Sequence, residues 1–162
     1  MNFMTTIEST MRFSMDSNIL IYAEGTDDLV KRDRALLTIG RIGTGNIVLP
    51  MQTAGETLRW LMRKGRLDRR TAVERTTMWM EQCEPLGVST ASFRKALELV
   101  SRNGFQIWDA VILSASSEAG AAVLLSEDMR HGFNWGGVTV VNPFVLSEPE
   151  LLQLTSTQST MH

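Results

Sequence analysis

The sequence predicts one α/β domain with three layers, in which helices cover both faces of a mostly parallel central β-sheet. Short apolar runs, typical of buried parallel strands, alternate along the chain with longer segments of helical periodicity. The chain has 162 residues, which is within the usual size of a single domain. Neither an internal repeat nor a linker-like segment interrupts this alternation.

The predicted sheet begins with a short strand over residues 12–15, followed by a buried helix whose apolar block is residues 19–23. Asp16 or Ser17 is predicted to cap that helix. In an open α/β sheet, ligands bind in the crevice at the carboxyl ends of the strands. Asp16 is therefore expected at the edge of the sheet where chemistry usually takes place.

The middle of the chain continues the alternation of helices and strands. Glycines and prolines mark the ends of most of these elements. The predicted order is a helix over 26–39, a strand over 47–49, a helix over 53–65, a helix capped by Asp68, an edge strand or loop over 86–88, and a helix that begins at a Thr90 cap and ends at Asn103-Gly104.

The last third of the chain contains the most apolar segments. Residues 107–119 predict a central helix with little polar surface, and Gly120 ends it. The runs 121–125 and 138–141 are uninterrupted apolar stretches, as expected for strands covered on both faces. We divide the chain into a leader (1–10), the α/β domain (11–146) and a C-terminal tail (147–162).

Composition excludes several kinds of protein. No apolar run approaches the roughly 20 residues needed to span a bilayer, and residues 1–10 lack the pattern of a secretory signal. We therefore expect a cytoplasmic protein without a membrane partner. A single cysteine, Cys83, excludes an intramolecular disulfide and a cysteine-based zinc site. With only two histidines, His131 and His162, any metal would be held mainly by oxygen.

Four acidic residues lie at the ends of predicted strands or in the first turns of predicted helices: Asp16, Glu56, Asp109 and Asp128. Each has a purely structural explanation as well. Asp16 can cap a helix, Thr53 and Glu56 have the spacing of a capping box, Asp109 suits the first turn of a helix, and Asp128 suits a turn. Taken singly, these explanations are sufficient.

Taken together, the four acids are harder to explain structurally. Asp109 lies in a segment predicted to be buried, and burying a carboxylate is costly without compensation. Four converging carboxylates would also repel one another, and a divalent cation would remove that cost. With oxygen ligands only, the expected ion is Mg²⁺ or Mn²⁺, which can activate water and stabilise the leaving oxygen of a phosphodiester.

These acids stand in segments that resemble the successive acidic motifs of PIN-domain nucleases, in particular VapC-type toxins of bacterial toxin–antitoxin pairs. The resemblance covers residues 11–146 and implies a Mg²⁺- or Mn²⁺-dependent endoribonuclease that hydrolyses RNA, such as tRNA or rRNA, with a metal-activated water. It further implies a homodimer held inactive by a cognate antitoxin of a type II system. The segments are MDSNILIYA, QTAGETL, IWDAVILSAS, LLSEDMRHG and VVNPF.

The same resemblance implies roles for individual residues. It assigns metal binding and catalysis to the four acids, Asp16, Glu56, Asp109 and Asp128. Asn18 and Ser126 occupy supporting positions, and Ser126 stands where the family often has threonine.

A basic segment follows Glu56 directly. Arg59, Arg63, Lys64 and Arg66 are predicted to hold RNA phosphates beside the acidic crevice. The alternative is that these residues form a solvated helix face, which is the usual explanation of a run of charged residues. The net charge of −2 argues against a protein that coats DNA generally.

Two other functions compete with the nuclease. An aspartate-nucleophile phosphohydrolase could use Asp16, but that chemistry usually needs a second aspartate two positions later, where this chain has Asn18. An inactive PIN-like module could bind RNA or a protein without cleaving anything. The presence of all four acids gives no sign of lost activity.

Overall fold

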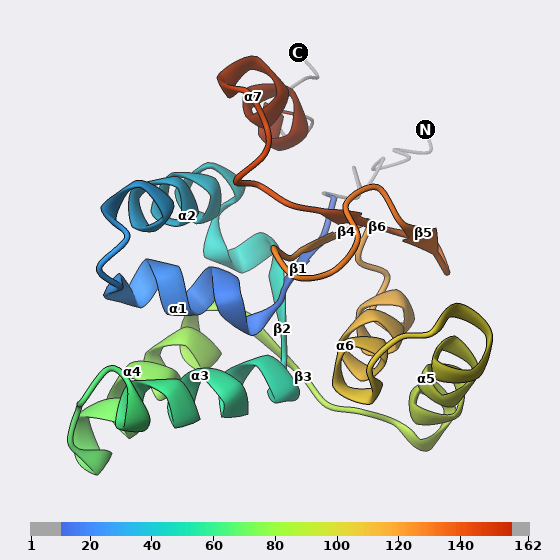
Figure 1. Ribbon diagram of the computed structural model, residues 1–162, viewed down its shortest axis with the longest axis horizontal. Coiled ribbons are helices and arrows are strands. Elements are labelled where there is room, and N and C mark those ends of the chain that lie inside the picture. The colour runs from blue at the N-terminus through green and yellow to red at the C-terminus, as the bar shows by residue number, and fades with distance from the viewer. Residues whose placement is uncertain (1–10, 157–162) are drawn as a thin grey trace, which may run out of the picture.

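The computed structural model describes residues 11–156, so the predicted leader and the last six residues of the predicted tail lie outside the described residues. A sheet of strand order β3-β2-β1-β4-β6-β5 lies at its centre (Figure 1). The strands are β1 (Phe13–Met15), β2 (Ile47–Pro50), β3 (Glu84–Leu86), β4 (Val123–Leu125), β5 (Asn134–Trp135) and β6 (Val138–Val141). The helices are α1 (Ser17–Gly25), α2 (Leu29–Ile42), α3 (Met51–Arg63), α4 (Arg69–Gln82), α5 (Thr90–Asn103), α6 (Ile107–Glu118) and α7 (Glu148–Ser156), and a short 3₁₀ helix covers Thr44–Asn46.

The sheet is parallel apart from its last strand, as predicted. Met15 of β1 pairs with Leu125 of β4, which in turn pairs with Val141 of β6. These three strands therefore end level with one another, and the residues that follow them, Asp16 and Ser126 among them, share one edge of the sheet. The antiparallel strand β5 was not predicted; it joins β6 through Gly136-Gly137, both at positive φ, as a two-residue hairpin turn requires.

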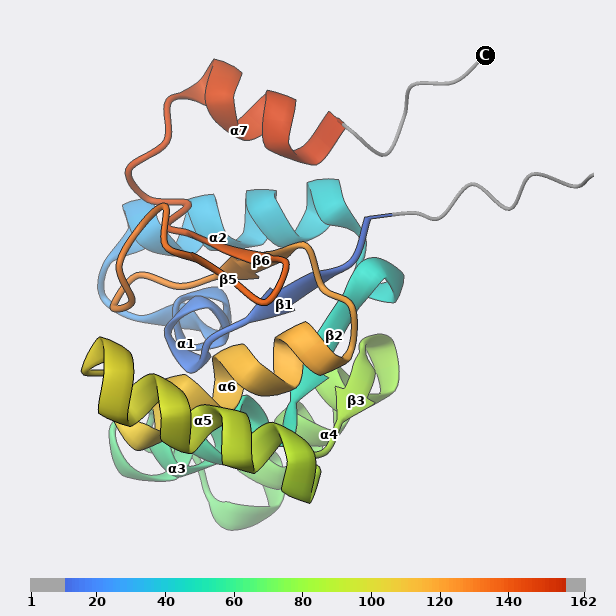
Figure 2. The same cartoon turned by 90° about the vertical axis from the view of Figure 1, so that its right-hand side faces the viewer.

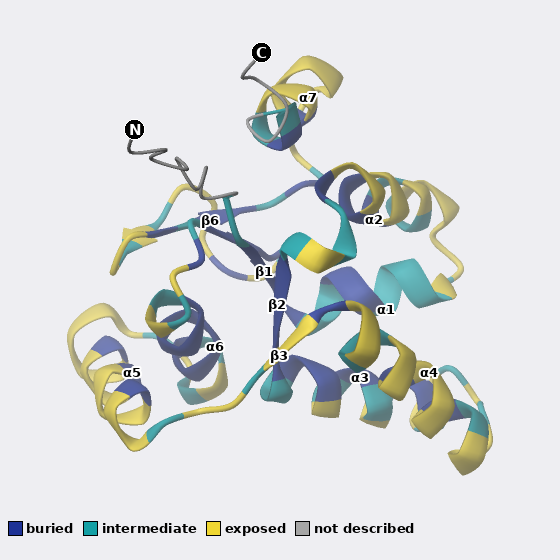
Figure 3. Cartoon of the chain, turned by 180° about the vertical axis from the view of Figure 1, so that it is seen from behind, coloured by how far each residue is buried: buried dark blue, intermediate teal, exposed yellow. Residues whose placement is uncertain are grey.

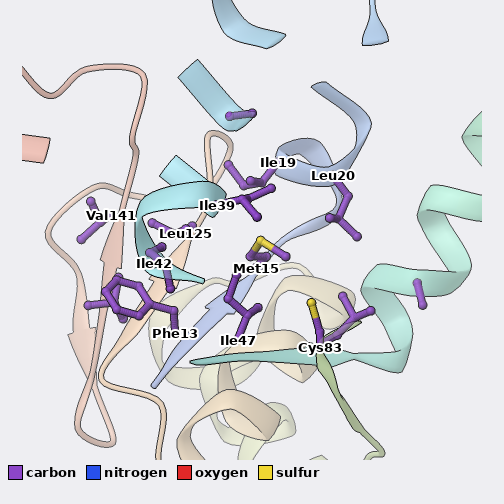
Figure 4. Close-up of a cluster of buried hydrophobic side chains, with 14 residues drawn as sticks. Phe13, Met15, Ile19, Leu20, Ile39, Ile42, Ile47, Cys83, Leu125 and Val141 are labelled. Carbon is purple, nitrogen blue, oxygen red and sulfur yellow. The ribbon is translucent and has the colours of Figure 1, made fainter. Parts of the chain in front are cut away.

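Helices cover both faces of the sheet, which confirms the three-layer prediction. On one face, strand residues such as Phe13 and Leu125 pack with α1 and α2 in a core that also contains Cys83 (Figure 4). On the other face, Leu124 and Val140 pack against α6 and α5. Figure 2 shows α2 and α7 stacked above the sheet with α6 and α5 below it.

Helix α6 is the central helix, as its apolar sequence predicted. Every residue from Ala110 to Ser116 is buried, because α5 covers the side of α6 that the sheet does not (Figure 3). A hydrogen bond of 2.7 Å from Ser116 Oγ to Ser14 Oγ joins this helix to β1. The helix therefore presents its first turn, which contains Asp109, from a fixed position.

Helix α3 begins at Met51, directly after Pro50 and two residues earlier than predicted. Thr53 does not cap it. The Thr53 hydroxyl is buried and donates instead to the carbonyl oxygen of Met15 at 2.7 Å. The capping-box explanation of Glu56 is therefore wrong, because Thr53 has a tertiary partner and Glu56 lies in the second turn.

Helix α7 occupies more than half of the predicted C-terminal tail. Ser147 and Glu150 form a capping box: the Glu150 N–H donates to Ser147 Oγ at 3.3 Å and the Ser147 N–H donates to Glu150 Oε2 at 2.7 Å. Leu151 is buried, and Arg34 of α2 pairs with Glu148. No helix within residues 11–156 has both the length and the apolar character required to cross a membrane.

Candidate active site

Asp16 lies between β1 and α1 and is almost fully buried, with 4% of its surface exposed. It caps α1, since its Oδ1 accepts the Ser17 N–H at 2.7 Å. Its Oδ2 accepts hydrogen bonds from Ser126 Oγ at 2.8 Å and from Asn18 Nδ2 at 3.3 Å. The predicted cap is confirmed, and the same carboxylate lies at the edge where the strands end.

The environment of Asp16 raises its pKa from 3.8 to about 6. Burial is the largest cause, and the negative charges of Asp109 and Glu56 add to it. The hydrogen bonds from Ser126 and Ser17 act in the opposite direction. Three carboxylates that are far apart in the sequence are thus close enough to influence one another.

Glu56 and Asp109 approach this edge from two helices. Glu56 is half-buried in α3, where its Oε1 accepts a hydrogen bond from Gln52 Nε2 at 2.8 Å. Asp109 is half-buried in the first turn of α6, and the neighbouring Trp108 is 52% exposed, so the expectation of a fully buried segment is wrong here. Burial raises the pKa of Asp109, with further contributions from Glu56 and Asp128.

Asp128 is exposed in the turn after β4 and is tied to Asp16 through one amide. Asn18 Nδ2 donates to Asp128 Oδ2 at 3.2 Å as well as to Asp16, and Asn18 Oδ1 accepts the Glu127 N–H at 3.2 Å. Ser126 also joins this turn to Asp16 through its hydroxyl. Of the two residues predicted to be supporting, Asn18 therefore connects two of the acids, and Ser126 connects Asp16 to the turn that contains Asp128.

Lys31 is a neighbour of the site that sequence reasoning missed. It lies in α2, forms an ion pair with Glu127, and donates a hydrogen bond to the Tyr22 hydroxyl at 3.2 Å. Its ammonium group also lies 5.0 Å from the centre of the Tyr22 ring and 5.6 Å from that of Phe144. Because Lys31 and Glu127 are 96 positions apart, no local pattern could have revealed this pair.

The acidic donors at this edge are suited in type to a hard divalent cation, which prefers oxygen ligands. Among residues 11–156, no three acidic, histidine or cysteine side chains lie close enough together to hold a metal ion as they stand. Burial and mutual repulsion nevertheless raise the pKa of Asp16 and of Asp109. A bound cation such as Mg²⁺ or Mn²⁺ would offset both effects by favouring the charged carboxylates.

Separate cavities border the acids. One of about 460 Å³ is lined by Glu56 and Arg59 together with apolar side chains of α3, α5 and α6. Another of about 640 Å³ is lined by Asp109 and Asp128 together with side chains at the end of α5 and in the turn after β4. A ligand could therefore reach the acids from more than one cavity.

Most of the predicted basic segment lies along one further cavity, of about 290 Å³, between α1 and α3. Arg59, Arg63 and Lys64 line it together with Glu56. Arg66 is exposed beyond the end of α3, at a positive φ of 54°, and does not line this cavity. Three of the four predicted basic residues are therefore placed beside an acidic site residue.

The pKa of Asp16 leads to a prediction about stability. Because the folded chain holds this proton more tightly than the unfolded chain, the contribution of Asp16 to stability is fully present below pH 3.8 and declines as the pH rises through about 6. We compare the free energies of unfolding of the wild type and of Asp16→Asn, both in EDTA. The difference, wild type minus variant, should fall by on the order of 3 kcal/mol over this pH range. Urea unfolding between pH 4 and 8 measures this difference, and a constant difference would contradict the prediction.

The comparisons with known proteins agree with this architecture. The family model for the PIN domain matches residues 15–133, a range that includes all four acids. A toxin–antitoxin complex from Klebsiella pneumoniae is similar in structure, with a TM-score of 0.62 and 18% identity over 80% of this chain and 96% of that chain. No curated protein matches the sequence.

Two other solved structures are similar in fold. VapC20 of Mycobacterium tuberculosis, described as a toxin that cleaves the sarcin-ricin loop, aligns with a TM-score of 0.59 and 16% identity over 69% of this chain and 86% of its own. A DNA-bound VapBC complex from Salmonella typhimurium gives a TM-score of 0.57 and 15% identity, covering 80% of this chain and 96% of that chain. These structures show a shared fold, and the family model covers most of the sequence, so the chain belongs to the PIN-domain family.

Proposed function

We propose that this protein is a Mg²⁺- or Mn²⁺-dependent endoribonuclease and the toxin of a type II toxin–antitoxin pair. The observation that carries the proposal is the convergence of acids from four segments at one edge of the sheet, where burial, together with the charges of Asp109 and Glu56, raises the pKa of Asp16. Groups whose pKa is strongly shifted by burial and by neighbouring charges are concentrated at functional sites, and capping α1 accounts for Asp16 alone and not for Glu56, Asp109 or Asp128. The similarity in fold to toxin–antitoxin complexes lends further support.

In this proposal Asp16, Glu56, Asp109 and Asp128 hold the cation. A bound divalent ion would supply an activated water and would stabilise the leaving oxygen of the phosphodiester. Ser126 and Asn18 would keep the Asp16 carboxylate in place through the hydrogen bonds described above. Asn18 would also hold Asp128, so that the turn after β4 stays at a constant distance from the end of β1.

The competing phosphohydrolase is less consistent with the geometry of Asp16. That chemistry usually requires a second aspartate two positions after the nucleophile, whereas Asn18 stands there and donates hydrogen bonds to Asp16 and Asp128.

Cleavage experiments distinguish the nuclease from an inactive module. Purified protein should cleave single-stranded RNA with Mg²⁺ or Mn²⁺ and not in EDTA, and an Asp128→Asn preparation should be inactive. Equal cleavage by both proteins would identify a contaminating nuclease.

The basic side chains along α3 are proposed to bind RNA phosphates. Replacing Arg59 and Arg63 by serine should weaken RNA binding and reduce the steepness of its salt dependence, since fewer counterions are released on binding. Fluorescence anisotropy with labelled RNA at several salt concentrations measures both quantities. Arg94 and Lys95, which are exposed on α5 and line none of the cavities described above, provide a matched double variant. An unchanged salt slope in the Arg59 and Arg63 variant would identify a solvated helix face.

We further propose that a cognate antitoxin inhibits the protein by covering this crevice. The 460 Å³ cavity beside Glu56 is lined by apolar side chains, including Met51, Phe93 and Trp108, and would accept an apolar segment running along α3. A partner arginine could pair with two of the carboxylates at once. A partner that binds tightly but leaves RNA cleavage unchanged would contradict this placement.

The homodimer that the family resemblance implies is also part of the proposal. The sedimentation coefficient of the purified chain tests it.

A further inference from the structure

Apart from Asp109 and Asp128, the residues that line the 640 Å³ cavity have no role in the function proposed above. Its volume is about 640 Å³, within the range of about 300–1,000 Å³ typical of small-ligand sites. It lies where α5 ends, α6 begins and the turn after β4 passes, and Figure 2 shows α5 running alongside α6. Neither Glu56 nor the basic side chains of α3 line it, so it is separate from the cavities beside Glu56.

The polar side chains of this cavity are available to a ligand. Asn103 and Gln106 are exposed, and their side-chain amides have no hydrogen-bond partner within residues 11–156. Arg130 is also exposed and makes no ion pair with any residue in that range. An amide group offers both a donor and an acceptor and can pair with the edge of a nucleobase. Arginine suits a phosphate or the face of a base.

Aromatic side chains form another part of the lining. Phe105 and Phe133 are both half-buried, and their ring centres lie 5.1 Å apart at an angle of 48°. Both rings pack against the buried core between α6 and the sheet, which limits their movement. The cavity thus combines a fixed apolar surface with unpaired amide and guanidinium groups, as sites for unpaired bases do.

Resting on the proposed function, we infer that this cavity binds the nucleotide next to the cleaved bond and reads its base through Asn103 and Gln106. A phosphodiester held at the acids would have one neighbour toward the basic side chains of α3 and the other in this cavity. Base edges are accessible to such amides only when the nucleotide is unpaired. The inference therefore predicts a sequence preference on one side of the cut, in RNA whose bases are unpaired there.

The test uses single-stranded oligoribonucleotides that differ only in the nucleotides flanking the cleaved bond. For the wild type, kcat/KM should depend on the nucleotide at one flanking position by about tenfold. The double variant Asn103→Ala, Gln106→Ala should lose that preference. Its kcat/KM on the least favoured RNA should equal that of the wild type. The double variant Arg94→Ala, Lys95→Ala should keep the preference. Circular dichroism checks that each variant is folded.

Each possible result decides the inference. An unchanged preference in the Asn103 and Gln106 variant overturns it and leaves the proposed function intact. An equal loss of activity on every RNA, or wild-type cleavage that ignores the flanking nucleotides, also overturns it. If the Asn103 and Gln106 variant selects RNA as the wild type does but no longer binds a protein partner, the cavity is a binding site for that partner instead. If the wild type cleaves no RNA at all, the proposed function fails, and this inference fails with it.

Discussion

Replacing Asp109 by asparagine should lower RNA cleavage by orders of magnitude. The substitution keeps the size of the side chain but removes one of the charges that would hold the cation, so weaker metal binding and slower cleavage are expected together. Without metal, the variant should unfold no more easily than the wild type. Burial and the charges of Glu56 and Asp128 raise the pKa of Asp109, so its negative charge opposes folding.

The measurement compares initial rates of cleavage of one RNA at matched Mg²⁺, salt and protein concentrations. Glu81→Gln is a suitable control, because Glu81 is an exposed carboxylate on α4 that lines none of the cavities described here. Full activity in Asp109→Asn would rule out the proposed mechanism. Loss of activity accompanied by loss of stability in EDTA would contradict the account of repulsion among the acids.

Replacing Leu113 by alanine should destabilise the protein by about 2–5 kcal/mol, because it removes a buried side chain and leaves a cavity. Leu113 has no exposed surface and lies in the core between α6, α5 and the sheet. Since small domains are stable by only about 5–15 kcal/mol, this is a large share of the total. Urea unfolding of the two forms measures the difference.

Leu97→Ala provides the matched control for that substitution. Leu97 is 50% exposed on α5, so the same chemical change there should cost well under half as much. If Leu97→Ala and Leu113→Ala were equally destabilising, α6 would not be the central helix of the core between α6, α5 and the sheet. Because α6 carries Asp109, loss of its packing should also reduce RNA cleavage near the unfolding transition.

Much of this fold follows from local patterns in the sequence. The apolar runs of β4 and β6, the buried helix α6 and the left-handed Gly104 after α5 all lie where periodicity and turn residues predicted. Capping was less predictable. Thr53 to Glu56 and Ser147 to Glu150 share the same spacing, yet only the second is a capping box. The carbonyl of Met15 takes the Thr53 hydroxyl, and that contact depends on the tertiary structure.

The candidate site could be predicted in outline only. A general property of parallel sheets, that strand ends share an edge, was enough to expect Asp16 and Asp128 together. The contacts that hold them could not be read from the sequence alone, because Ser126 and Asp16 are 110 positions apart, as are Asn18 and Asp128. Asp109 was expected to be buried because its helix is apolar, but the first turn of that helix reaches the surface.

The central claim is that the four acids form one divalent-cation site, and direct measurement of Mn²⁺ binding to the RNA-free protein tests it most directly. Electron paramagnetic resonance of free Mn²⁺ should show binding to the wild type and to Glu81→Gln. Binding should be lost or strongly weakened in Asp16→Asn and in Asp109→Asn, because each substitution removes a carboxylate from the proposed site. Equal Mn²⁺ binding by all four proteins would contradict the claim, whatever their activity on RNA.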